Sequence, residues 1–327
     1  MAAYTTIDNP ELYFQTKTYT GTEDELAITL DGDENMQPDF VWIKRRPTSQ
    51  SHFIFDSARG ATKYMNSNSS DQEYTQAQGL KSFDSDGFTL GTWDGPNDDV
   101  TNVAWCWKET ATAGFDMVLY TGNGSNRTIS HSLSATPDLV IIKKRNNTGN
   151  WMVGGSTMLG GDNKLLLLDT TAALDTNSEV YQSFSSSTFG IGVNAYTNAN
   201  TDTFIAYCFS AKQGYSAMGS YKGNGNADGS FIYLGFKPAW FLCKNTQDAG
   251  DNWILHDNKR NTFNVTDEGL APNSNEAEFT DVDMDFLSNG VKMRNNTGRS
   301  NASKSFIYIA FAESPFVNSN GVPNNAK

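Results

Sequence analysis

Three segments of equal length open on the same short motif. Tyr19-Thr-Gly21, Tyr120-Thr-Gly122 and Tyr221-Lys-Gly223 follow one another at a constant spacing of 101 residues. Each segment continues into a proline, an Asp or Ala, four apolar residues and a lysine, at residues 38–44, 137–143 and 238–244. Aromatic and aliphatic strings close the segments at residues 103–107, 205–209 and 309–313. A fixed period predicts a modular array, and the absence of a strong catalytic motif favours a surface or binding protein over an enzyme.

The period divides the 327 residues into three predicted domains. Their predicted bounds are 1–110, 111–212 and 213–316, and residues 317–327 form a predicted flexible tail. A unit of about 100 residues is long enough to bury a core of its own. The connections at 108–114 and 211–219 are short and carry no charge runs, so we expect a semi-rigid rod or a compact triad.

The segments read as short strands separated by Gly-, Asn-, Asp- and Ser-rich turns, which predicts an all-β fold. In the first segment the predicted strands cover residues 40–44, 52–56, 87–91 and 103–107. The last of these places Val103, Trp105 and Trp107 on one face, and Ala104 and Cys106 on the other. This alternation predicts a central strand in an antiparallel β-sandwich or jelly roll, so the fold prediction is three tandem β-sandwich repeats. A closed three-bladed arrangement is the less usual alternative.

Net charge excludes one class of partner. The chain has 24 Lys and Arg against 37 Asp and Glu, a net charge of −13, whereas binding to a phosphate backbone needs clustered cations. No run reaches 18 consecutive apolar residues, so membrane insertion is not expected.

The three cysteines are interpreted as small buried residues. Cys106 and Cys208 occupy equivalent places in two closing strings, and the third string has Ala312 at the place assigned to them. A position that accepts both Cys and Ala does not indicate a disulfide or a nucleophile, and it fits synthesis in a reducing cytosol. Cys243, the third cysteine, lies in the apolar string at residues 238–244.

No catalytic residue, cofactor or metal site is predicted. His52, His131 and His256 are dispersed without zinc-ligand spacing. His52 and His256 are placed at similar points of segments one and three, each followed by an aspartate within four residues, and no nucleotide-binding glycine motif follows a strand. Residues 224–230 resemble half of a calcium loop, but the twelfth position is Gly235, so a hairpin turn is the favoured interpretation.

Carboxylates gather at residues 23–25, 31–34, 84–86, 98–99 and 281–285. A carboxylate pair could hydrolyse glycosidic bonds, because that reaction needs an acid and a base or nucleophile a few ångströms apart. These clusters are flanked by Gly, Ser and Asn and do not recur between segments. Solvated loops are therefore the favoured interpretation.

Trp93 is the one candidate ligand-binding residue, and the ligand it would bind is unknown. It lies in the sequence Gly-Thr-Trp-Asp-Gly, which indicates an exposed loop, and an exposed indole is suited to stacking on a sugar ring. Trp42, Trp105, Trp107 and Trp240 lie in apolar strings and are expected in the core.

The strings at residues 83–91, 103–108, 120–124 and 137–146 together resemble an uncharacterised repeat of about 100 residues, common in virion proteins of tailed bacteriophages, particularly marine ones. The resemblance implies a virion surface protein of the tail-fibre, tail-tip or capsid-decoration type. It implies assembly in the host cytoplasm, contacts with itself and with other virion proteins, and attachment to host-surface glycans. No catalytic residue comes with it. A tailspike-like polysaccharide-degrading enzyme and a free lectin are the alternatives.

Overall fold

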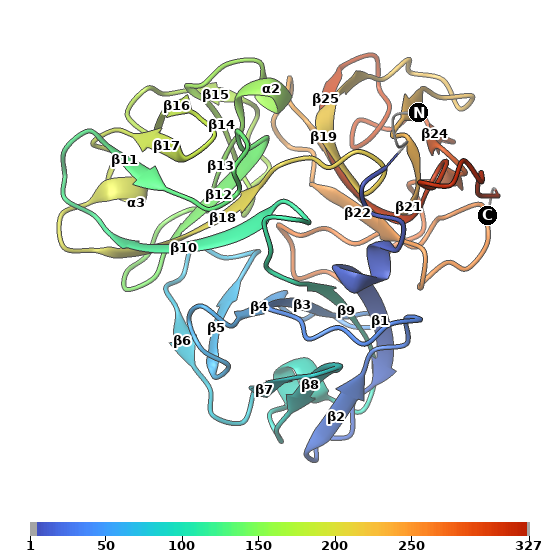
Figure 1. Cartoon of the computed structure of the whole chain (residues 1–327), viewed down its shortest axis with the longest axis horizontal. Coiled ribbons are helices and arrows are strands. Elements are labelled where there is room, and N and C mark those ends of the chain that lie inside the picture. Colours follow the sequence, from blue (N-terminus) through green and yellow to red (C-terminus); the bar gives the residue numbers. More distant parts are fainter. Residues whose placement is uncertain (1–4, 326–327) are drawn as a thin grey trace.

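Antiparallel β-sheets form the regular structure of the chain, which this computed structural model describes over residues 5–325. Three lobes surround a common centre (Figure 1). Strands β1–β9 form the first lobe, here called unit 1; β10–β18 form unit 2, and β19–β25 form unit 3. The all-β prediction is confirmed. None of the helices in residues 5–325 is long and apolar enough to cross a membrane.

Unit 1 contains η1 (Pro10–Leu12), β1 (Phe14–Thr20), β2 (Leu26–Thr29), β3 (Phe40–Arg45), β4 (Phe53–Asp56), β5 (Lys63–Asn66), β6 (Tyr74–Thr75), β7 (Leu80–Asp84), β8 (Gly87–Leu90), α1 (Asp94–Asn97) and β9 (Thr101–Trp107). The four strands predicted in this segment correspond to β3, β4, β8 and β9. Sequence reasoning missed β1, β2, β5, β6 and β7.

Units 2 and 3 follow the same plan. Unit 2 contains β10 (Phe115–Thr121), β11 (Arg127–Ser130), β12 (Leu139–Lys144), β13 (Met152–Gly154), α2 (Ser156–Leu159), β14 (Lys164–Leu167), β15 (Asp175–Thr176), β16 (Tyr181–Phe184), β17 (Thr188–Ile191), α3 (Ala195–Asn198) and β18 (Thr203–Phe209). Unit 3 contains β19 (Ser216–Lys222), β20 (Phe231–Tyr233), β21 (Phe236–Asn245), β22 (Ile254–Asp257), β23 (Met284–Leu287), β24 (Gly290–Met293) and β25 (Ser305–Pro315).

Each unit pairs a large sheet with a three-stranded sheet. The large sheets have the orders β1-β9-β3-β4-β5-β6, β10-β18-β12-β13-β14-β15 and β19-β25-β21-β22. The small sheets have the orders β2-β8-β7, β11-β17-β16 and β20-β24-β23. Equivalent strands therefore take equivalent places in the three units. The domain bounds at residues 110, 212 and 316 stay a prediction. In the predicted tail, Val317 bridges to Pro323, and Ser319 donates a hydrogen bond to Asp8.

Strand register corrects one predicted equivalence. Trp107 lies opposite Phe14, Phe209 opposite Phe115, and Phe311 opposite Ser216. Ala310 of β25 therefore takes the place of Cys106 and Cys208, and the prediction of Ala312 is wrong. The apolar and small residues of β25 allow both alignments, and only the pairing with β19 distinguishes them.

The alternation in the closing strands separates two kinds of core. Ala104 and Cys106 of β9 face the small sheet of unit 1 and join its sandwich core, and equivalent residues do so in the other units. Val103, Trp105 and Trp107 point the other way, into a central core that all three units share. The large face of the strand thus holds the units together, while its small face lets the second sheet approach closely.

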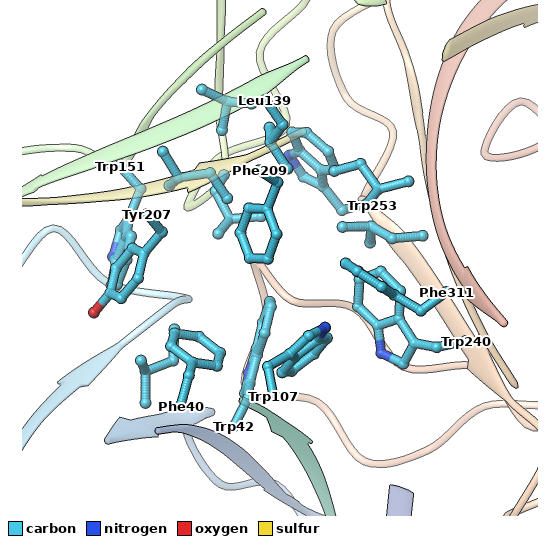
Figure 2. A pocket seen from close by; sticks show the side chains of 16 residues that line it. Phe40, Trp42, Trp107, Leu139, Trp151, Tyr207, Phe209, Trp240, Trp253 and Phe311 are labelled. Atoms are coloured by element: carbon cyan, nitrogen blue, oxygen red, sulfur yellow. The ribbon is translucent and has the colours of Figure 1, made fainter. Parts of the chain in front are cut away.

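Aromatic rings from the three units meet in the central core (Figure 2). Trp107 contacts Trp240 with ring centroids 5.6 Å apart, and Phe209 contacts Phe311 at 5.9 Å. The cavity enclosed there has a volume of about 40 Å³ and an apolar lining. It is far smaller than the roughly 300 Å³ of a typical ligand pocket, so this centre is a packing core.

Interfaces between successive units close the array into a ring, and one backbone hydrogen bond recurs in all three. The backbone N–H of Glu73 donates to the carbonyl of Arg145 at 2.7 Å. In the same way Leu174 donates to Thr246 at 3.0 Å, and Glu278 donates to Arg46 at 2.9 Å. The last of these joins unit 3 to unit 1. The structure therefore has the compact triad and not the rod, and it is closed, as in the three-bladed arrangement expected to be the less usual alternative.

Candidate functional site

The recurring Tyr-X-Gly motif is a structural lock. The Tyr19 hydroxyl donates to the carbonyl of Pro96 at 2.6 Å, and the buried Asn97 amide donates to the carbonyl of Gly91 at 2.8 Å. A Cβ at Gly21 would lie 2.1 Å from the carbonyl oxygen of Asp98, so only glycine fits there. The same lock recurs at Tyr120, Gly122 and Asn198, and at Tyr221, Gly223 and Asn301. Sequence reasoning found the tyrosines and glycines but missed the asparagines, whose signal is a nearly constant offset from the tyrosine.

Recurring lysines at equivalent places in β3, β12 and β21 are structural as well. Lys44, Lys143 and Lys244 are fully buried, and burial lowers the pKa of each to about 8. Their ammonium groups donate to backbone carbonyls. Lys143 reaches Ser70 of unit 1 at 2.9 Å, and Lys244 reaches Thr171 of unit 2 at 3.5 Å. Lys143 and Lys244 thus hold the loop of the preceding unit, whereas Lys44 donates to the carbonyl of Arg45 within its own unit.

A buried ion network fills the interface between units 1 and 2. Asp56 pairs with Arg59 and accepts a hydrogen bond from the Tyr207 hydroxyl of unit 2 at 2.7 Å. At the edge of this interface, Arg145 of unit 2 pairs with Glu73 of unit 1 at 2.9 Å. The buried charges are thus paired and hydrogen-bonded, as burial requires.

The interface between units 3 and 1 repeats this network. Asp257 pairs with Arg260 at 2.6 Å and accepts from the Trp105 indole at 2.9 Å, while Glu278 pairs with Arg46 at 3.0 Å. Burial alone would raise the pKa of Asp257, but the charge and hydrogen bonds of Arg260 hold it below its usual value.

The histidines do not form a site. Strand register places His52 with Trp151 and Trp253, whereas His256 corresponds to Phe55, so the predicted equivalence of His52 and His256 is wrong. His52 accepts a hydrogen bond from the Trp42 indole at 3.0 Å. His256 is fully buried, and burial lowers its pKa to about 3. His131 belongs to unit 2, where its ring lies beside the carbonyl of Ser185.

The three cysteines are buried, and their thiols are free. Burial raises the pKa of Cys106, Cys208 and Cys243, to about 12 for Cys243. No group of three or more His, Cys, Asp and Glu side chains in residues 5–325 is placed to hold a metal ion. In the calcium-like loop, the Asn224 side chain accepts from Asn226 N–H and donates to the Asp228 carbonyl, as in a turn.

The acidic clusters are largely occupied by neighbouring cations and turn donors. The ion pairs are Glu25 with Lys81, Asp31 with Lys17, Asp98 with Arg45, Asp281 with Arg299, and Asp285 with Arg294. Asp84 instead accepts hydrogen bonds from Ser82 and Thr89. The structure therefore gives the carboxylates of these clusters roles in loop conformation.

One carboxylate pair that the sequence did not predict lies at the connection of units 1 and 2. Burial and then the carboxylates of Asp116 and Asp39 raise the pKa of Glu109. Glu109 also accepts from the backbone of Met117 at 2.7 Å, and Asp116 accepts from Ser132. Through these hydrogen bonds both side chains fix the path of the chain at this connection.

Trp93 belongs to an aromatic surface on unit 1, defined by Tyr64, Tyr74 and Trp93. The Trp93 ring lies 4.8 Å from that of Tyr64, and the Tyr64 ring stacks on Tyr74 at 5.3 Å and 26°. Phe53 supports Trp93 edge-to-face from within the core. Trp93 is half-buried, contrary to the exposed position expected from its loop, while Tyr74 is 38% exposed.

Different parts of unit 1 bring the aromatic surface together. Tyr64 and Tyr74 face each other across β5 and β6, and the backbone N–H of Trp93 donates to the carbonyl of Gln78 at 2.9 Å. Partial desolvation and then the Asp71 carboxylate raise the pKa of Tyr74, which keeps its hydroxyl neutral beside a hydrogen-bond acceptor. Stacked rings with a polar rim are suited to binding the apolar face of a sugar.

Unit 2 lacks this surface. Leu165, Asp175 and Asn194 occupy the places of Tyr64, Tyr74 and Trp93. The aromatic surface is therefore not part of the scaffold that units 1 and 2 share. Sequence reasoning missed both tyrosines, because only the folded chain brings them to Trp93.

Comparison with known proteins places the chain in a family. The sequence profile of a family described as a domain of unknown function (DUF7483) matches residues 9–315. No curated protein matches the chain.

Proposed function

The chain belongs to the DUF7483 family, whose function is unknown. We propose that this member is a non-enzymatic surface protein of a virion that attaches to host-surface glycans. The aromatic surface of Tyr64, Tyr74 and Trp93 is the observation that carries the proposal. It combines stacked rings, partial exposure and an adjacent carboxylate on a rigid sheet. The sequence resemblance to phage virion repeats supports the particle as its location.

A rigid scaffold suits this role. Recurring residues fill the central core, the three interfaces and the Tyr-Gly-Asn locks, so they are committed to structure. Binding residues on such a scaffold lose little conformational entropy when a ligand arrives. Copies of this chain and other virion proteins are the partners we propose on the particle.

Titration with purified host-surface polysaccharide tests the attachment role. Tyr74→Ala should weaken binding about tenfold, because removing one stacked ring costs on the order of 1.4 kcal/mol. Because Tyr74 lies exposed at the edge of the sheet, this variant should keep the fold of the wild type. Tyr233→Ala, which removes a 62% exposed ring from unit 3, is the matched control and should bind like the wild type. Equal binding by all three proteins would refute the aromatic surface as the site.

Immunogold labelling of intact phage particles tests the location. Label on the tail or head supports a virion protein, and its position distinguishes a fibre from a decoration protein. Particles without label, from a lysate that contains the protein, would refute the virion assignment and leave a free lectin.

A polysaccharide-degrading enzyme is the second candidate, and the Glu109–Asp116 pair is the observation that favours it. A carboxyl with a raised pKa beside a second carboxylate is what glycoside hydrolysis uses. Release of new reducing ends from host polysaccharide by purified protein, abolished in Glu109→Gln, would establish the enzyme. The non-enzymatic proposal expects no release by either protein.

A further inference from the structure

A pocket of about 340 Å³ lies between units 2 and 3. Six of its lining residues determine what it could bind: Met158, Lys164 and Leu174 of unit 2, and Ser220, Thr246 and Gln247 of unit 3. Its volume is within the range of small-molecule sites, unlike that of the central cavity. It lies at the one interface of the ring that lacks the buried ion network.

Equivalent positions show what the pocket lacks. At the interface of units 1 and 2, the Glu73 carboxylate forms ion pairs with Arg145 at 2.9 Å and with Lys63 at 3.9 Å. At the interface of units 2 and 3, the backbone hydrogen bond is kept, but Leu174 stands in the place of Glu73 and Thr246 in the place of Arg145. The interface of units 2 and 3 therefore lacks both the carboxylate and the guanidinium that pair at the interface of units 1 and 2.

One cation of the network remains. Register places Lys164 where Lys63 lies in unit 1, because Lys63 pairs with Thr75 and Lys164 with Thr176 in equivalent strands. Within residues 5–325 the Lys164 ammonium has no hydrogen-bond or ion-pair partner, and the Ser220 hydroxyl has none either. The pocket thus keeps the lysine of the network without its carboxylate.

We propose that this pocket binds a small hydroxylated carboxylate of the hexuronate class. Its carboxylate lies beside Lys164, where Glu73 lies beside Lys63 in unit 1. Its hydroxyl groups hydrogen-bond with the Ser220 hydroxyl and donate to Thr246 Oγ1, whose own proton is donated to the Ser305 carbonyl. They also accept from the amide nitrogen of Gln247, since the Gln247 side-chain oxygen accepts from the Ser305 N–H. Its ring packs on Met158 and Leu174. The assignment uses no residue of the aromatic surface, so it stands or falls independently of glycan attachment there.

Calorimetric titration with sodium glucuronate tests the proposal, with glucose and sodium sulfate as the other two arms. We expect glucuronate to bind with a Kd of about 1 mM, a weak single-site affinity, and neither glucose nor sulfate to bind comparably. Absence of glucuronate binding would overturn the proposal. Equal binding of sulfate would overturn the carboxylate assignment and leave a general anion site.

Two variants and one control locate the binding. Lys164→Met should weaken glucuronate binding at least tenfold. Leu174→Glu supplies the carboxylate that unit 1 has, so it should fill the site from within and abolish binding, while the melting temperature confirms a folded protein. Lys81→Met removes an exposed lysine that pairs with Glu25 in unit 1 and should bind like the wild type. Wild-type affinity in Leu174→Glu would contradict this location.

Discussion

At the scale of single residues, two buried histidines link the stability of the fold to pH. His52 and His256 are fully buried, and burial is the main reason that the pKa of each is lowered. Neither ring nitrogen of His256 has a hydrogen-bond partner in the described chain. A buried imidazole of this kind stays neutral in the folded state and takes up a proton when the chain unfolds.

Acid should therefore destabilise the fold through His256. Below the unfolded pKa of about 6.5 the unfolded state binds the proton and the folded state does not, so stability falls as pH decreases. His256→Phe introduces the residue present at the equivalent position, Phe55. The loss of unfolding free energy between pH 7 and pH 5 should shrink by about 2 kcal/mol in this variant, since one pKa unit corresponds to about 1.36 kcal/mol. Urea unfolding at both pH values measures it, and an unchanged difference would contradict the assignment.

At the scale of elements, the Tyr-Gly-Asn lock ties the first strand of each unit to the turn before its last strand. In unit 2 the Asn198 amide donates to the carbonyls of Ser125 and Gly192, both at 2.7 Å, and accepts from the Asn123 N–H at 3.0 Å. One buried side chain therefore satisfies three backbone groups.

Removing that side chain should weaken the fold without touching the aromatic surface. Asn198→Ala leaves three backbone groups without partners, and the expected loss is about 3 kcal/mol of unfolding free energy. Asn126→Ala, at an exposed position of the same loop region, is the control and should stay within about 0.5 kcal/mol of the wild type. Urea unfolding compares them, and similar values for both variants would contradict the lock.

Element-scale patterns also mark what sequence could predict. The alternation of Val103, Trp105 and Trp107 with small residues predicted a central strand with two different faces, and β9 is that strand. The equivalence of Ala312 with the cysteines failed, because the apolar string of β25 fits two alignments that differ by two residues. Hydrophobic alternation is blind to a shift of two residues, which returns every side chain to the same face.

The candidate site was predicted only in part, because its residues lie far apart in the sequence. Trp93 was found from its own loop, but Tyr64 and Tyr74 come from strands β5 and β6, which the sequence did not reveal. Asn97 and its equivalents were missed because asparagine in a turn-rich segment usually indicates solvent exposure. The lysine motif was visible, but the hydrogen bonds of Lys143 and Lys244 to the preceding units cannot be derived from local pattern.

At the scale of the whole molecule, the three units share one core and two ion networks. Trp105 of unit 1 reaches Asp257 of unit 3, and Tyr207 of unit 2 reaches Asp56 of unit 1. In unit 3 the position of Trp105 and Tyr207 is Ile309, and in unit 2 the position of Asp56 and Asp257 is Gly155. Donor and acceptor are thus absent together at the third interface, where the pocket lies.

The shared core makes the ring a single cooperative molecule. An isolated unit would expose Trp107, Phe209 or Phe311 together with its half of an interface, and burial of such rings is a main source of stability. The three sandwich cores therefore depend on the central one. We therefore propose that any binding function belongs to the surfaces formed by residues that do not recur between the units.

Differential scanning calorimetry of the intact chain measures this cooperativity most directly. We expect a single transition whose calorimetric enthalpy equals its van't Hoff enthalpy, because no unit can unfold without opening the shared core. Three resolved transitions, or a calorimetric enthalpy about three times the van't Hoff value, would show three independent domains and contradict the central claim.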